Sequence, residues 1–415
     1  MKGLRILKVD MFHKNYFSML LLMPLILLPM LATDIYLPAM SSMGQEFKSD
    51  YAHLMLTLTT YMVGYSLSLL FSGVLADRYG RRPIVLFGVA IFIFSSMACY
   101  FSSSVEALTI GRFFQALGGG CGTLLARVIV RDFYDLESQV KVLSYLAAGL
   151  VLSPILGPLF GGYLVTYYGW RSIFLALSIF ASIVLVFLLA YLEESMPRVV
   201  KKSSDSISST LYRYLRLLTY YEFQFHTLVI SFAWAVYFSF VSSSPGLLQG
   251  FHGLTPVEYG YVFSTTLGGY ILGTIFIRRK IGLIPIKDLI FIAGLVMLAS
   301  TSCLLMLSIL GIYNLPILLV FILTSLFGVG VIFPATQAGV TSSFNRDIGL
   351  ISGLFYSIEM LFGAICSYIL SNASGVTWLT TSLVMFFSAV ILFFLTVRDR
   401  VRNDTSSLRF HNFIK

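Results

Sequence analysis

Twelve long apolar runs are the feature of this sequence that most limits what it can fold into. A helix needs about 20 mostly apolar residues to cross the hydrocarbon core of a bilayer. Hydrophobic residues make up 57% of the chain and charged residues 11%, against roughly 45–50% and 25% in soluble domains. Most of the outer surface is therefore expected to face lipid. The runs lie at 17–40, 51–74, 83–103, 107–129, 142–165, 172–192, 226–248, 258–277, 288–310, 316–340, 349–371 and 377–397.

The form of these runs favours helices over a β-barrel. Each run is continuous and ends at a charged or Gly/Pro-rich turn, whereas the strands of a membrane barrel alternate between apolar and polar residues. We therefore predict an all-α membrane protein with twelve transmembrane helices.

Lys and Arg residues are distributed unevenly between alternate connections. Of the 28 in the chain, all but Lys48, Arg112 and Arg171 fall in one set of connections and in the two terminal segments. Cytoplasmic loops are enriched in these residues, so both termini are predicted to be cytoplasmic. The net charge of +9 does not indicate nucleic-acid binding, because the cations are spread in small groups and form no single basic face.

The longest loop divides the runs six and six. We predict a first six-helix bundle at 1–195, a cytoplasmic linker at 196–221, a second six-helix bundle at 222–400 and a cytoplasmic tail at 401–415. The stretch LYRYLRLL at 211–218 is expected to form a short amphipathic helix on the membrane surface. Two segments, 73–82 and 273–282, run from a glycine into a basic turn. Such pseudo-repeats are typical of transporters, whose substrate site lies near the midplane between the halves.

Asp34 and Arg112 are charged residues inside predicted spans, where insertion scales put the cost at about 2.5–3.5 kcal/mol. At 1.5 Å per residue both lie roughly 8–9 Å below the same membrane surface, so an ion pair between them is geometrically allowed. We interpret Asp34 as a proton carrier tuned by Arg112, because burial favours the neutral carboxyl and a nearby cation favours the ionised one. The alternative is a permanent structural pair that never changes protonation.

Glu359 lies near the middle of the eleventh run, in the stretch GLFYSIEMLFG. Intramembrane acids usually mark ion or substrate pathways. Two roles stay open for Glu359. It is either a second carboxylate for protonation or cation binding, or a neutral glutamate that is hydrogen-bonded within the bundle.

Aromatic residues recur at helical spacing in the second and seventh runs, so each set shares one helix face. Such faces offer cation-π contacts to lipophilic amines, and the alternative is packing or lipid contact. The candidate pocket-lining residues are Met30, Tyr61, Tyr65, Trp234, Tyr237 and Phe238.

The turn after the second run, GVLADRYGRRP, resembles motif A of the major facilitator superfamily. The resemblance implies a cytoplasmic latch, in which Asp77 faces the N-terminus of the eleventh helix and Arg81 pairs with Asp132. The alternative is a generic basic turn. In the second half Ile277 takes the place of Asp77, so the charged latch is expected to be lost there. The motif residues are Gly73, Asp77, Arg78, Gly80, Arg81 and Arg82.

Two further stretches resemble motifs of the same superfamily. In the fourth run, Arg112, Gln115 and the glycines at 118–120 resemble motif B. The fifth run resembles motif C, which is associated with antiporters. The alternative for motif C is a packing seam that has no bearing on the direction of transport. The motif C residues are Pro154, Gly157, Pro158, Gly161 and Gly162.

The segment ATDIYLPAM at 32–40 is similar to the first-helix signature of the Bcr/CflA family of drug/proton antiporters. Four more phrases fit that family: ARVIVRDFY at 126–134, SPILGPLFGGYL at 153–164, GWRSIF at 169–174 and SSSPGLLQ at 242–249. Glu359 departs from the pattern, which usually carries an uncharged residue there. The resemblance implies a monomeric, multi-pass protein of the bacterial inner membrane that exchanges an amphipathic or cationic small molecule for protons.

The energy source is expected to be a proton gradient with no cofactor and no metal, because the chain lacks a phosphate-binding glycine loop followed by Lys and Ser or Thr. The short loops supply no catalytic constellation, so an enzyme is not expected. Two alternatives keep the same fold. One is an exporter of an endogenous metabolite or siderophore, and the other is a proton symporter for uptake.

Overall fold

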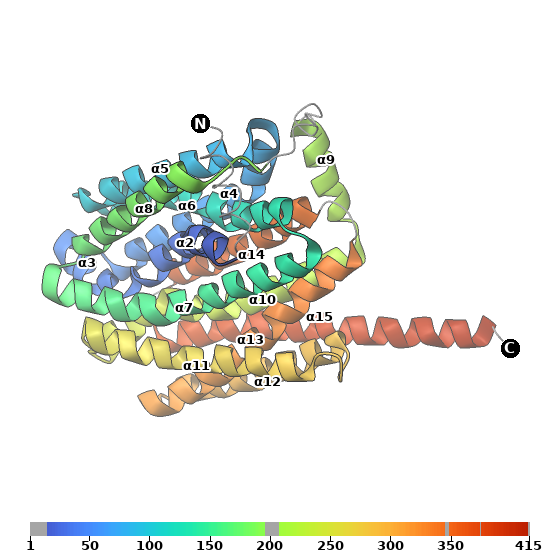
Figure 1. Cartoon of the computed structure of the whole chain (residues 1–415). Coiled ribbons are helices and arrows are strands. Elements are labelled where there is room, and N and C mark those ends of the chain that lie inside the picture. The colour runs from blue at the N-terminus through green and yellow to red at the C-terminus, as the bar shows by residue number, and fades with distance from the viewer. Residues whose placement is uncertain (1–14, 196–206, 345–347, 374, 414–415) are drawn as a thin grey trace, which may run out of the picture.

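The computed structural model describes residues 15–195, 207–344, 348–373 and 375–413. Every regular element in these ranges is helical, which confirms the predicted all-α fold. The elements of the first half are α2 (Asn15–Asp34), η1 (Leu37–Ala39), α3 (Met40–Phe47), α4 (Tyr51–Tyr79), α5 (Arg81–Tyr100), α6 (Val105–Phe133), α7 (Leu136–Tyr168) and α8 (Arg171–Tyr191). They run roughly alongside one another in the upper part of Figure 1.

The second half is built in the same way. Its elements are α10 (Tyr221–Ser244), the π-helical segment η3 (Pro245–Phe251), α11 (Pro256–Lys280), α12 (Ile286–Ile309), α13 (Leu315–Ser343), α14 (Ile348–Ser371) and α15 (Trp378–Phe413). A short helix, α9 (Ile207–Leu217), connects the halves.

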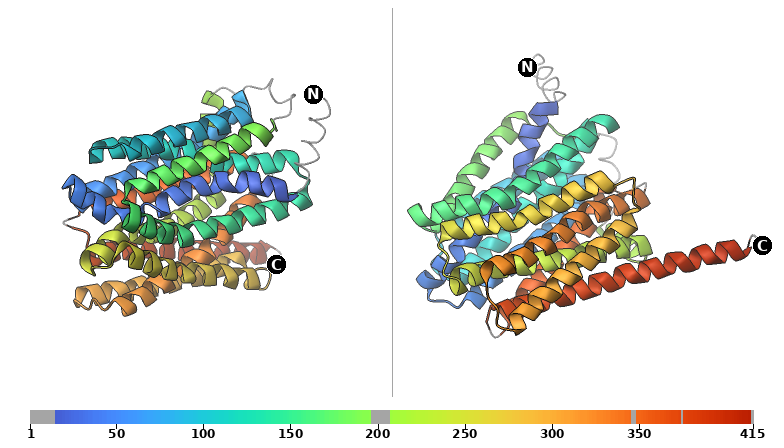
Figure 2. Two further views of the ribbon diagram at one scale, coloured as in Figure 1. Left: turned by 60° about the vertical axis from the view of Figure 1, so that its left-hand side comes forward. Right: turned by 90° about the horizontal axis from the view of Figure 1, so that it is seen from below.

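Each predicted run corresponds to one long helix or to a helix with its short continuation. Eleven segments of the described chain are long and apolar enough to cross a bilayer. The remaining run, 142–165, lies inside α7, which is 33 residues long. The twelfth helix extends further than predicted, because α15 continues to Phe413 through the segment predicted as a tail (Figure 2).

The halves meet mainly along two helix pairs, α4 with α14 and α7 with α11. Within each half the corresponding pairs also match, since α4 packs on α6 as α11 packs on α13. Both of these pairs depend on a glycine. A Cβ atom on Gly64 would overlap the carbonyl oxygen of Phe113, and one on Gly269 would overlap that of Leu323. Close backbone approach at small residues is typical of packing between membrane helices.

The connecting helix α9 contacts both halves. The Tyr214 hydroxyl donates a hydrogen bond to the carbonyl oxygen of Leu70 in α4 (2.9 Å). Tyr214 and Leu217 are buried in a cluster with Ile351 and Phe355 of α14. On the other face of α9, the side chains of Leu211, Tyr212 and Leu215 are exposed. The amphipathic helix predicted at 211–218 is therefore present, and one of its faces is covered by protein.

Candidate functional site

Asp34 lies where the first membrane segment changes from one helix to the next. Helix α2 ends at Asp34, and the chain turns before η1 begins at Leu37. Pro38 in η1 has no backbone N–H and so cannot continue the α-helical hydrogen bonding. The Asp34 side chain is 5% exposed. Its Oδ2 accepts a hydrogen bond from the Ser153 hydroxyl of α7 (2.9 Å).

The glycines of the motif C stretch bring α7 against this break. A Cβ atom on Gly157 would lie 2.6 Å from the Cβ of Asp34, and one on Gly161 would overlap the carbonyl oxygen of Ile35. Gly162 faces the other half, where its Cβ would overlap the carbonyl oxygen of Pro256 in α11. The α7 helix, which carries Pro154 and Pro158 in its interior, therefore approaches both the Asp34 break and the second half at backbone distance.

Adding one methyl group at Gly161 is expected to separate α7 from the first membrane segment. The Gly161→Ala variant should unfold at a lower temperature in detergent and transport more slowly, because the backbone at Ile35 must move to accept the new Cβ. The matched control is Gly268→Ala in α11, where a Cβ would meet no atom within 4 Å. That variant should be neutral or slightly stabilised, by up to about 1 kcal/mol, since alanine favours helix. Equal behaviour of the two variants would contradict the packing argument.

Arg112 is fully buried in α6 and binds the broken end of α2. Its Nη1 donates to the carbonyl oxygen of Ala32 (2.9 Å) and to Oε1 of Gln115 (2.7 Å). Gln115 in turn donates through Nε2 to the Ser96 hydroxyl (2.8 Å). Carbonyl groups in the last turn of a helix lack intrahelical partners and attract cations. Arg112 therefore supplies a donor that the break in the helix requires.

Two tyrosine rings enclose the Arg112 guanidinium. Its central carbon lies 4.4 Å from the centre of the Tyr36 ring and 4.0 Å from that of Tyr61. The Tyr61 hydroxyl donates to the carbonyl oxygen of Pro29 (2.7 Å). Tyr61 therefore contacts Arg112 through its ring and α2 through its hydroxyl. Tyr65, one turn further along α4, forms a hydrogen bond with the Thr123 hydroxyl (2.9 Å).

Similar depths allowed an ion pair between Asp34 and Arg112, but in the described structure the two side chains bind other partners. The carboxylate is hydrogen-bonded to Ser153 of α7, and the guanidinium of Arg112 binds the backbone carbonyl of Ala32 and the Gln115 side chain. The depth argument gave the position of each residue along the membrane normal, but not the direction in which its side chain points. The break after Asp34 gives Arg112 a carbonyl acceptor, so the arginine needs no carboxylate to be held in place.

Glu359 lies in the middle of α14 and is 1% exposed. Its Oε2 has no hydrogen-bond partner in the structure. The charged group that acts on this carboxyl electrostatically is Arg127 of α6, whose guanidinium carbon lies 4.7 Å from the centre of the Tyr356 ring.

Arg127 was missed by the sequence reasoning, which counted it among the loop cations. It lies inside α6, which continues to Phe133. The signal was available, because the predicted fourth run already extended to residue 129. A second cation therefore projects from α6, about 22 Å along the helix from Arg112 at 1.5 Å per residue.

The aromatic residues predicted on α10 form one cluster. The centre of the Trp234 ring lies 5.2 Å from that of Tyr237 and 5.7 Å from that of Phe238. Phe333 of α13 joins them at 5.9 Å from Trp234. Met30 of α2 is partly buried and packs against the main core.

The motif A turn forms a charged cluster at the end of the molecule that carries most basic residues, here called the basic end. Arg81 Nε lies 3.3 Å from Oδ2 of Asp132, and Arg81 also pairs with Asp77. The Glu194 carboxylate accepts hydrogen bonds from the backbone N–H groups of Arg81 (2.9 Å) and Arg82 (3.2 Å) at the start of α5.

Gly80 is required where this turn enters α5. Its φ of +107° favours glycine, and a Cβ there would lie 2.5 Å from the Glu194 carboxylate. The neighbouring Arg78 lies 5.5 Å from the centre of the Tyr79 ring. Gly73, about two turns before Gly80, packs against Leu124.

The Asp77 side chain is 65% exposed. The resemblance to motif A implies that Asp77 faces the start of the eleventh helix. Residues 345–347, just before α14, lie outside the described ranges. That contact is therefore not among the described ones.

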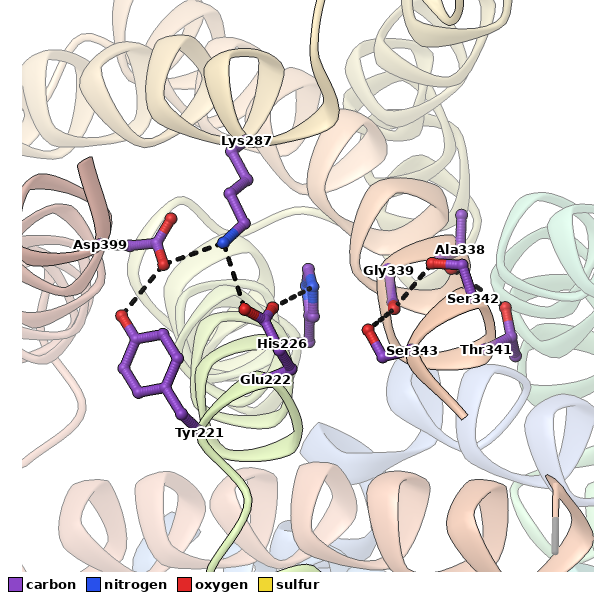
Figure 3. Close-up of polar contacts among 10 residues, drawn as sticks. All are labelled: Tyr221, Glu222, His226, Lys287, Ala338, Gly339, Thr341, Ser342, Ser343 and Asp399. Atoms are coloured by element: carbon purple, nitrogen blue, oxygen red, sulfur yellow. Dashed lines mark hydrogen bonds and ion pairs between the residues drawn. The ribbon is translucent and has the colours of Figure 1, made fainter. Parts of the chain in front are cut away.

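The second half has its own charged cluster at the basic end (Figure 3). Ile277, which takes the place of Asp77, is buried. Lys287 Nζ lies 3.1 Å from Oδ1 of Asp399 and 3.4 Å from Oε1 of Glu222. The Tyr221 hydroxyl donates to Asp399 (3.0 Å). The charged latch expected to be absent from the turn at 273–282 is a different feature, because the charges of this cluster lie on other elements. They come from α10, α12 and α15, and the turn at 273–282 does not supply them.

Comparison with known proteins agrees with this architecture. A family model described as Major Facilitator Superfamily matches residues 22–367. The uncharacterized MFS-type transporter YdgK of Bacillus subtilis (strain 168) is 27% identical over 90% of this chain and 93% of its own length. The multidrug resistance protein MdtL of Escherichia coli O157:H7 (strain EC4115 / EHEC) is 30% identical over 59% of this chain. That alignment spans about three fifths of MdtL, since it covers 61% of its length.

Solved structures share the fold at low sequence identity. A D-xylose-proton symporter superimposes with a TM-score of 0.71 at 14% identity, over 92% of this chain and 98% of the symporter. The human organic anion transporter MFSD10 gives a TM-score of 0.69 at 16% identity, over 92% of this chain and 99% of that protein.

Proposed function

Because the chain belongs to the major facilitator superfamily, and is thus a membrane transporter of small molecules that needs no cofactor, we propose that it exports amphipathic small molecules in exchange for protons. Within the superfamily we assign it to the Bcr/CflA drug/proton antiporters. We place it in the bacterial inner membrane as a monomer, with the basic end in the cytoplasm.

The environment of Asp34 is the observation that carries this proposal. Asp34 is almost fully buried, and its hydrogen-bond partner is a neutral hydroxyl, that of Ser153. A carboxyl in a permanent ion pair would keep its charge. A buried carboxyl held only by a hydroxyl can exist in either protonation state, because the hydroxyl can donate to the ionised form or accept from the neutral one.

The position of Asp34 couples its protonation to movement of the halves. It lies at the end of α2 and contacts α7, and α7 in turn packs on α11 of the second half. In the proposed cycle, Asp34 takes a proton from the outer side and releases it to the cytoplasm. The substrate binds in the cytoplasm-facing state and leaves when the molecule opens outward. Arg112 acts as a positioning residue that holds the end of α2.

The motif residues receive supporting roles in the same cycle. The Arg81, Asp77 and Asp132 cluster stabilises the closed cytoplasmic face as a latch. The motif C glycines give α7 a smooth surface along which α2 and α11 shift. The resemblance of MdtL, which carries the name multidrug resistance protein, supports a drug-like substrate.

Proteoliposomes with an imposed pH gradient test the proposal. We expect chloramphenicol, a neutral amphipathic probe, to accumulate in vesicles whose interior is acidic. In an antiporter, protons that leave the vesicle down their gradient drive the substrate into it. Accumulation only in vesicles with an alkaline interior would show proton symport and uptake. Equal levels in protein-containing and empty vesicles under both gradients would contradict proton-coupled transport of such molecules. A metabolite exporter would show gradient-driven uptake of a charged metabolite and not of the drug probe.

A further inference from the structure

Glu359 is a buried acid whose hydrogen-bonding capacity is not satisfied within the described structure. It is 1% exposed, and its Oε2 has no partner. Buried polar atoms almost always have a partner, and an isolated ionised carboxylate in an apolar environment is costly. A group that is unsatisfied in this way calls for an external partner, such as a proton or a bound cation.

Trp234 of α10 also has a buried polar atom without a hydrogen-bond partner, and it packs against the face of α14 that carries Glu359. The Trp234 Nε1 is buried without a hydrogen-bond partner. The indole lies over Gly363, where a Cβ would come within 2.5 Å of Nε1. Gly363 follows Glu359 by one helical turn, so the two positions share one face of α14.

Further aromatic rings extend this face across neighbouring helices. Phe333 of α13 contacts Trp234, with ring centres 5.9 Å apart, and Tyr270 of α11 contacts Phe333 at 6.0 Å. Tyr270 also lies within electrostatic range of Glu359. Three helices of the second half, α10, α11 and α13, therefore contribute aromatic rings to the region around the Glu359 carboxyl of α14.

Arg127 does not neutralise Glu359 by direct contact. Arg127 acts on the carboxyl electrostatically, but the ion pairs of the described residues, which extend to 4.0 Å, do not include one between them. Arg127 instead lies over the Tyr356 ring. It belongs to α6 in the first half, so its distance from Glu359 depends on how the two halves are placed.

We propose that Glu359, together with Trp234, Phe333 and Tyr270, forms a binding site for the charged group of a lipophilic organic cation. A carboxylate beside aromatic faces is the arrangement that recognises such ligands. The inference rests on the proposed transport function and assigns separate roles to the two buried acids. Asp34 in the first half carries the proton, and Glu359 in the second half binds the charge of the substrate.

Direct binding of radiolabelled tetraphenylphosphonium to the purified full-length protein tests the site. We expect Glu359→Gln to weaken binding at least about tenfold, because it removes the charge and keeps the shape. Trp234→Leu should weaken binding about fivefold through the lost cation-π contact. Glu359→Asp should restore most of the affinity. Glu106→Gln, which removes an exposed carboxylate at the far end of α6, should bind within about twofold of the wild type.

Several outcomes would overturn the site. Wild-type affinity in Glu359→Gln would show that the carboxylate does not bind the cation. Unchanged binding in Glu359→Gln with lost pH-gradient-driven transport would make Glu359 a proton carrier. Failure of the wild-type protein to bind tetraphenylphosphonium at about 1 mM would also exclude the site. Since binding is measured without a gradient, its result does not depend on whether transport is coupled to protons.

Discussion

Asp34→Asn is expected to abolish pH-gradient-driven accumulation of substrate in proteoliposomes. One pH unit corresponds to 1.36 kcal/mol, which is a tenfold concentration ratio for each proton exchanged. With an imposed difference of about two units, the wild type should approach a ratio of about 100 for a neutral substrate exchanged for one proton, if charge balance is maintained by potassium and valinomycin. Asparagine keeps the volume and the hydrogen bond to Ser153 but carries no proton, so the ratio should fall to about one.

The same variant should still exchange substrate for substrate across the membrane, because alternating access itself needs no free energy from the gradient. Ser153→Ala serves as the matched control. It removes the hydrogen-bond donor that Asp34 uses and leaves the carboxyl, so gradient-driven accumulation should persist. If Asp34→Asn accumulates substrate at the wild-type rate, Asp34 is not the proton carrier.

Replacing Arg112 is expected to have the largest effect on stability. Arg112→Met leaves the Ala32 carbonyl and Gln115 without their donor, and each unsatisfied buried group costs about 1–3 kcal/mol. The free energy of unfolding should therefore fall by roughly 2 kcal/mol or more, measured by denaturant titration in detergent micelles. Arg112→Lys keeps the charge but loses the planar group that fits between Tyr36 and Tyr61. We expect it to recover less than half of the lost stability.

Arg171→Lys is the matched control for this pair of variants. Arg171 also contacts an aromatic ring, that of Trp170, and it pairs with Glu46. Its side chain is partly exposed, so exchange for lysine should change stability by less than about 1 kcal/mol. A lysine at position 112 that is as stable as the wild type would show that charge alone, and not the shape of the guanidinium, holds the end of α2.

The fold was predictable because bilayer thickness sets the length of each helix and hydropathy reveals it directly. Each predicted run corresponds to a helix within a few residues at most boundaries. The boundaries differ where a helix continues into water, as α15 does, because backbone hydrogen bonding does not stop at the membrane surface. The pairing of Arg81 with Asp132 was implied by the resemblance of this turn to motif A, and the two side chains lie 3.3 Å apart in the structure.

Side-chain partners inside the bundle were less predictable. A helical sequence gives the depth of each residue but not its direction relative to helices far away in the chain. Arg112 and Asp34 have similar depths and yet use different partners. Lys287 and Asp399, which are 112 positions apart, meet only because α12 and α15 pack together. Arg127 was misassigned because counting of basic residues treats every cation near a helix end as a loop residue.

The position of α9 restricts how the halves can separate. Tyr214 is bonded to α4 of the first half, while Leu217 lies among side chains of α14 in the second. Any opening that widens the distance between α4 and α14 at this end must either carry α9 with one half or detach it from both. The segment that joins the two bundles in the sequence thus also holds them together in space. The free energy needed to break its contacts adds to the activation barrier for opening the molecule on this side.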